Sequence, residues 1–109
     1  MPTTYKVLGQ VAPSATTNTD LYTVGAGKSA VVSTIAIANR GATSATYRVA
    51  IRVAGAAIAN EDYIAYDATI TANNSTMITI GVTLAATDVI TVYASNANLS
   101  FNAFGSEIS

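Results

Sequence analysis

Cysteine, histidine and tryptophan are absent from this chain of 109 residues. Without cysteine the chain has no disulfide, no thiolate nucleophile and no cysteine-bound zinc. Without histidine the usual nucleophile–base pairs of covalent catalysis are also missing. The chemistry left to the side chains is therefore mainly that of carboxylates.

Charged residues are scarce as well, at 10% of the chain, whereas ordinary soluble domains carry about 25%. The five lysines and arginines are spread out and form no basic patch, so neither a nucleic acid nor a membrane surface is an expected partner. A surface of Ala, Thr, Ser and Asn is easily desolvated, because few ions must shed water. This composition favours a protein that packs against copies of itself or a larger assembly. A monomer kept soluble by hydroxyls and amides is the alternative.

The length fits one domain, residues 1–109. Half of the residues are hydrophobic, but every apolar run is far shorter than the roughly 18–20 residues of a membrane-spanning helix. Residues 1–6 show no basic segment followed by an apolar stretch, so no secretory signal is expected. We therefore expect synthesis and assembly in a cytoplasm.

Apolar and polar residues alternate along residues 46–53 and 77–84, which is the pattern of a half-buried strand. Residues 29–38 are apolar or small at both parities, which predicts a strand covered on both faces. Gly, Pro and Asn separate the periodic segments. About eight short strands predict an all-β fold, an antiparallel β-sandwich or jelly roll. The other expected strands are 5–11, 21–24, 63–70, 88–94 and 99–104.

The apolar positions of the clearest strands predict the core. A charge at Ile80 is expected to destabilise the fold strongly, since a buried unpaired ion is very unfavourable. The predicted core residues are Val49, Ile51, Ile78, Ile80, Val82, Ile90, Val92, Leu99 and Phe101.

Three acidic residues, Glu61, Asp62 and Asp67, lie close together in the sequence. A glycosidase needs two carboxylates that face one cleft, and one loop-to-strand segment does not establish that. The Asp-x-Asp-x-Asp spacing of a calcium loop is missing too. We interpret these acids as solvated groups and a turn cap. Similarly, Gly25–Lys28 lacks the spacing of a phosphate-binding loop and predicts a tight turn.

Arg48 and Arg52 share the polar face of one expected strand, about 13 Å apart. Asp67 and Asp88 of the same chain are candidate partners, and acids of a neighbouring molecule are the alternative. The six tyrosines are expected mainly as core rings with the hydroxyl at the rim, although exposed tyrosines stack on sugars or anchor interfaces. We expect no catalytic, cofactor-binding or metal-binding residue, and no enzyme activity.

Several phrases resemble a family of small virion structural proteins of tailed bacteriophages. The resemblance covers nearly the whole chain but lies in fold-forming segments, not in active-site motifs. It implies a non-enzymatic component of a virion, without fixing its position on the particle. The phrases are Thr4–Gln10, Leu21–Val24, Ile37–Gly41, Ala85–Val89 and Leu99–Gly105.

Two functions follow from composition and resemblance together. The first is a capsid decoration or cement protein that stabilises the particle by packing on the coat. It predicts an exposed small-residue face and a homo-oligomer, with a trimer favoured by the resemblance. Its partners are the major capsid protein or neck and tail components, and Pro2–Tyr5 is expected to reach a neighbour as an added strand. The alternative is a neck, tail or fibre-type accessory protein that binds glycans, with a tyrosine-lined groove flanked by acids or amides.

Overall fold

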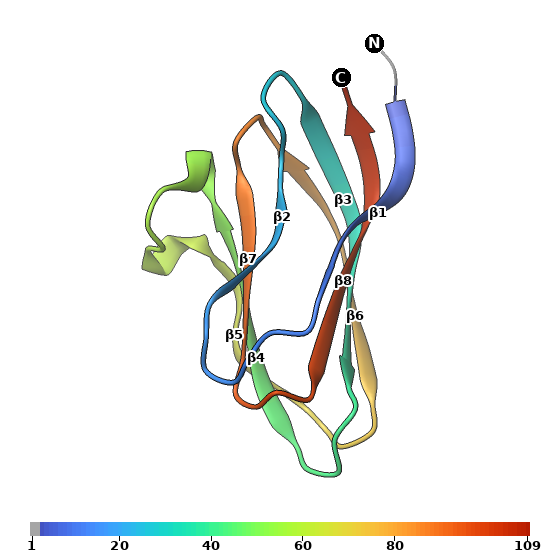
Figure 1. Ribbon diagram of the computed structural model, residues 1–109, viewed down its shortest axis with the longest axis vertical. Helices are drawn as coiled ribbons and strands as arrows, with labels where there is room; N and C mark the ends of the chain where they lie inside the picture. The colour runs from blue at the N-terminus through green and yellow to red at the C-terminus, as the bar shows by residue number, and fades with distance from the viewer. Residues whose placement is uncertain (1–2) are drawn as a thin grey trace.

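The computed structural model describes residues 3–109, which form two four-stranded antiparallel sheets packed face to face (Figure 1). The predicted all-β sandwich of eight strands is confirmed. No helix within residues 3–109 is long and apolar enough to cross a membrane. Sheet A has the order β1 (Thr3–Val11), β8 (Leu99–Ile108), β3 (Ser29–Asn39), β6 (Ser75–Leu84). Sheet B has the order β2 (Thr19–Thr23), β7 (Val89–Ala94), β4 (Ala45–Arg52), β5 (Tyr63–Ile70).

The strand pairing follows the jelly-roll pattern. β1 pairs with β8, β2 with β7, β3 with β6 and β4 with β5, as if one long hairpin were rolled up. The ladders β3–β8 and β4–β7 then join these pairs into the two sheets. Two short 3-10 turns, η1 (Val53–Gly55) and η2 (Asn60–Asp62), lie in the connection from β4 to β5, which projects on the side of sheet B (Figure 1).

The core lies between the two sheets. Tyr47 of β4 packs edge-on against Phe101 of β8, with ring centroids 6.4 Å apart. Ile51, Ile78 and Val82 are only partly buried and pack against the edge of this core. The remaining predicted core residues except Ile80 are buried, namely Val49, Ile90, Val92, Leu99 and Phe101.

The core prediction for Ile80 is wrong, because this side chain is 40% exposed. β6 is the edge strand of sheet A, so it has a neighbour on one side only. Its register with β3 also shifts here, and Ile80 and Gly81 together stand opposite the single residue Ser33. An inner-face position on an irregular edge strand is poorly covered, so a charge at Ile80 is not expected to be buried.

A second register shift explains why residues 29–38 are apolar at both parities. Val32 is buried at the start of β3, but further along the buried positions are Ile35 and Ile37. The extra residue in β3 is Ser33, since Val32 pairs with Gly105 and Thr34 with the preceding Phe104 of β8. The strand therefore changes the parity of its inward side, and its composition requires no second covered face.

The segment Pro2–Tyr5 is predicted to reach a neighbouring molecule, but its described residues, Thr3–Tyr5, are part of β1. Thr3 pairs with Ile108 and Tyr5 with Ser106, so both belong to the protein's own sheet. Pro2 lies outside the described residues. The prediction that this segment reaches a neighbour as a free arm is therefore wrong for Thr3–Tyr5.

Candidate functional site

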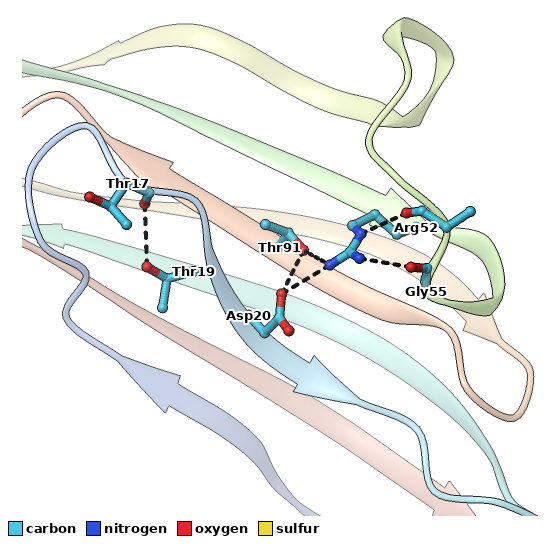
Figure 2. Close-up of polar contacts among 7 residues, drawn as sticks. Thr17, Thr19, Asp20, Arg52, Gly55 and Thr91 are labelled. Carbon is cyan, nitrogen blue, oxygen red and sulfur yellow. Dashed lines mark hydrogen bonds and ion pairs between the residues drawn. The ribbon is translucent and has the colours of Figure 1, made fainter.

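The outer face of sheet B carries a network centred on Arg52 of β4 (Figure 2). Its Nη1 donates to Asp20 Oδ1 at 3.2 Å and to Thr91 Oγ1 at 3.3 Å. Its Nη2 donates to the carbonyl oxygen of Gly55 at 2.7 Å, and its Nε to that of Ala56 at 2.8 Å. Arg52 therefore ties the β4–β5 connection to two strands of the sheet.

Asp88 is not the partner of either arginine, so that part of the sequence prediction is wrong. Its Oδ1 accepts a hydrogen bond from the Ala54 amide at 2.8 Å, and its Oδ2 accepts one from the Ala85 amide at 2.9 Å. A short, buried carboxylate of this kind suits backbone amides in turns. Asp88 thus holds η1 to the turn before β7.

The predicted pair of Arg48 with Asp67 is confirmed. Arg48 Nε donates to Asp67 Oδ1 at 2.7 Å, and Nη2 donates to Oδ2 at 3.3 Å. The hydrogen bond to Asp67 raises the pKa of Arg48 above its usual value. The guanidinium carbon also lies 4.3 Å from the ring centroids of both Tyr66 and Tyr93. A planar guanidinium can stack and form two parallel hydrogen bonds at once, which a lysine cannot.

Tyr66 forms an edge-to-face aromatic pair with Tyr63. Its centroid lies 4.8 Å from that of Tyr63, and the two ring planes meet at 82°. Tyr63 pairs with Ala50, which is only 1% exposed although it shares the outer face with Arg48. With Asn60 of η2, the two tyrosines line a hollow of about 390 Å³. We call this hollow the Tyr63–Tyr66 pocket, formed by Asn60, Tyr63 and Tyr66.

The other residues singled out in the sequence, Glu61, Asp62 and Gly25–Lys28, lie in turns. Asp62 Oδ2 accepts a hydrogen bond from the Ala59 amide at 3.0 Å, as a turn cap should, and Glu61 is exposed on η2. Within residues 3–109, no three acidic side chains gather into a possible metal site. Gly25–Lys28 forms the predicted turn between β2 and β3, closed by a 3.2 Å bond from the Lys28 amide to the Gly25 carbonyl.

The outer face of sheet A is different, because charged residues are scarce there among the described residues. Lys6 and Glu107 are the charged residues in the described part of its four strands. They pair with each other at 3.2 Å, and Glu107 also accepts a hydrogen bond from Tyr22 of sheet B. Large apolar side chains are instead exposed on this face: Tyr5 (84%), Val7 (47%) and Met77 (61%). A shallow hollow of about 490 Å³ is lined by Tyr5, Lys6, Val7, Val31, Ser33, Phe104, Gly105 and Ser106.

An ion cluster closes one end of the sandwich. Tyr22 of β2 donates its hydroxyl to Glu107 Oε2 at 2.7 Å. Lys6 and Lys28 lie 3.2 and 3.5 Å from Glu107 Oε1. The hydrogen bonds from Tyr22 and Lys6 hold the pKa of Glu107 below its usual value, while burial and the Glu107 contact raise the pKa of Tyr22. One carboxylate therefore joins a strand of sheet B to two strands of sheet A and a turn.

Acid should weaken this cluster. Since the folded state lowers the pKa of Glu107, its contribution to stability is full above the unfolded value of about 4.5 and is lost as the pH falls through the folded-state pKa. Thermal unfolding followed by circular dichroism should show a falling midpoint below about pH 5. Glu107→Gln should flatten that slope, whereas Glu61→Gln, at an exposed carboxylate, should not. An unchanged acid slope in Glu107→Gln would contradict this role.

Comparisons with protein-family models, curated proteins and solved structures found no match for this chain. Two outer faces are therefore the features from which we infer function: one is charged and aromatic, and the other is poor in charge and exposes large apolar side chains.

Proposed function

We propose that this protein is a non-enzymatic virion structural protein, which decorates or cements a capsid by packing the outer face of sheet A against the coat. The observation that supports this most directly is the scarcity of charge on that face, where Lys6 is the charged residue lining the hollow within residues 3–109, together with the exposure of Tyr5, Val7 and Met77. Covering such a face strips water from few ions, and apolar burial contributes about 25 cal/mol per Å².

The sequence resemblance to virion proteins of tailed phages supports the same proposal. The jelly roll occurs in viral capsid proteins and also in lectins, so the fold alone does not decide between them. In our proposal the protein is a symmetric homo-oligomer, with a trimer favoured by the resemblance. A position on the neck, tail or fibre, with glycan binding as the main role, is the alternative.

Apolar attachment predicts retention at high salt. At about 1 M salt the Debye length is ~3 Å, which screens exposed ion pairs but not apolar contacts. The protein should therefore stay on particles washed at that concentration and be detected there by quantitative mass spectrometry. A copy number in the hundreds supports capsid decoration, and a dozen or fewer supports the neck or tail. Absence from purified particles would refute the proposal, and release by salt alone would refute apolar attachment.

A matched pair of variants locates the attachment face. Val7 on sheet A and Ile64 on β5 are both aliphatic and similarly exposed, at 47% and 42%. Val7→Lys should weaken binding to stripped particles about tenfold or more, which corresponds to about 1.4 kcal/mol, while Ile64→Lys should bind as the parent does. Equal loss in the two variants would show that sheet A is not the attachment face.

A further inference from the structure

We propose that the Tyr63–Tyr66 pocket is a binding site for a small neutral saccharide. It lies on the outer face of sheet B, opposite the face proposed for capsid attachment, so it stays accessible when sheet A is covered. Its more exposed residue is Tyr66, which is 56% accessible although the Arg48 guanidinium lies over its ring, 4.3 Å from the centroid. Aromatic rings bind the C–H faces of sugars through their negative π-surface, and tyrosine adds a polar tip.

The backbone of β5 is built to place these groups together. Adjacent residues of a regular strand point to opposite faces of a sheet. Tyr47 pairs with Ala68 and Val49 with Ala65, so β5 has two residues, Tyr66 and Asp67, opposite Arg48 alone. Asp67 takes a left-handed conformation, with φ of 51°. This bulge allows Tyr66 and Asp67 to act on Arg48 from the same face, as bulges beside binding sites do.

The groups of the site are held in place before any ligand binds. Arg48 lies 4.3 Å from the centroid of Tyr66 and is fixed by its two hydrogen bonds to Asp67. The connection that carries Asn60 is anchored at its start by Arg52 and Asp88. A ligand that enters the pocket has few further side chains to immobilise, which lowers the entropic cost of binding.

The charges and volume of the site select the ligand class. The charge of the Arg48 guanidinium is neutralised by its pair with Asp67, so the site presents no net positive charge to attract an anion. Asn60 offers amide donors and an acceptor of the kind that sugar hydroxyls match. The hollow of about 390 Å³ lies at the lower end of the range for small-molecule sites, roughly 300–1,000 Å³. A compact, uncharged, polyhydroxylated ring satisfies all three conditions.

The test is titration of the isolated full chain by ¹H–¹⁵N NMR with methyl glycosides of glucose, galactose, mannose and N-acetylglucosamine. We expect at least one of them to shift the amide signals of Asn60, Tyr63 and Tyr66 in a saturable manner. Failure of all four to shift these signals would overturn the proposal. A larger shift with choline than with any sugar would also overturn it, since that would indicate a site for cations.

Two tyrosine variants separate the site from general effects. Tyr66→Ala should weaken saccharide binding at least tenfold. Tyr5→Ala, which removes an even more exposed ring from sheet A, should leave the affinity unchanged. Circular dichroism shows whether each variant is folded. Tyr66→Phe keeps the ring and should retain binding, and it is the variant to measure if Tyr66→Ala loses structure. Equal affinity in Tyr66→Ala and the parent would refute the assignment. Attachment to particles by sheet A is measured independently and stands or falls separately.

Discussion

Ile90→Lys is expected to prevent folding, whereas Ile80→Lys is expected to leave the protein folded. Both positions are isoleucines that the sequence assigned to the core, but Ile90 is 0% exposed on β7 and Ile80 is 40% exposed on the edge strand β6. Whole domains are stable by only about 5–15 kcal/mol, and an unpaired ammonium buried in an apolar core removes several of them. At Ile80 the lysine reaches water. Circular dichroism and soluble yield distinguish the two results.

Alanine variants give the same comparison in a measurable range. Ile90→Ala should lower the free energy of unfolding in urea by about 2–5 kcal/mol, the usual effect of emptying a buried isoleucine site. Ile80→Ala should lower it by about 1 kcal/mol or less, because little buried volume is removed. Similar losses at the two positions would show that the register shift in β6 does not uncover Ile80.

Gly105→Ala is expected to produce the second large loss of stability. Gly105 of β8 faces Val32 at the register shift of β3, and a Cβ there would overlap the carbonyl carbon and oxygen of Val31. Overpacking usually costs about 1–3 kcal/mol, and these neighbours are backbone atoms that cannot rotate away, so we expect the upper end or more. The measurement is urea unfolding.

Gly81→Ala is the matched control for this variant. Gly81 also lies on a strand of sheet A, but a Cβ there would meet no atom within 4 Å. Its effect should stay within about 0.5 kcal/mol, as for most surface substitutions. Equal destabilisation by the two alanines would show that the close approach to Val31 is not the cause.

Alternation of side chains was enough to predict the strands and the sandwich, because period-two burial is a local property of the backbone. It was not enough along β3, where a bulge changes which parity points inward without any change in residue type. It was not enough at Ile80 either, where an inner-face position on an irregular edge strand is poorly covered. Ser33 carries no sequence mark of its role. Asn39 similarly resembles a turn residue, but it is buried and donates to the carbonyls of Thr43 and Ile70.

The candidate site was only partly predictable for the same reason. Opposite charge and strand spacing indicated Arg48 and Asp67 as partners, among other combinations. The contacts of Tyr66 and Tyr93 with Arg48 depend on which strands become neighbours and on the extra residue in β5. Strand order is set by the long-range packing of the whole chain, and one sequence does not display it.

The rolled-up pairing has a consequence for how the chain reaches its folded state. Among the ladders formed by residues 3–109, β4–β5 is the one that joins consecutive strands. Thr3 at the start of β1 pairs with Ile108 at the end of β8. Such non-local contacts slow folding, because loop entropy is lost before the contacts form. During synthesis on the ribosome, β1 therefore stays unpaired until its partner strand β8 has emerged. Sheet A is completed only after Ile108 has been added to the chain.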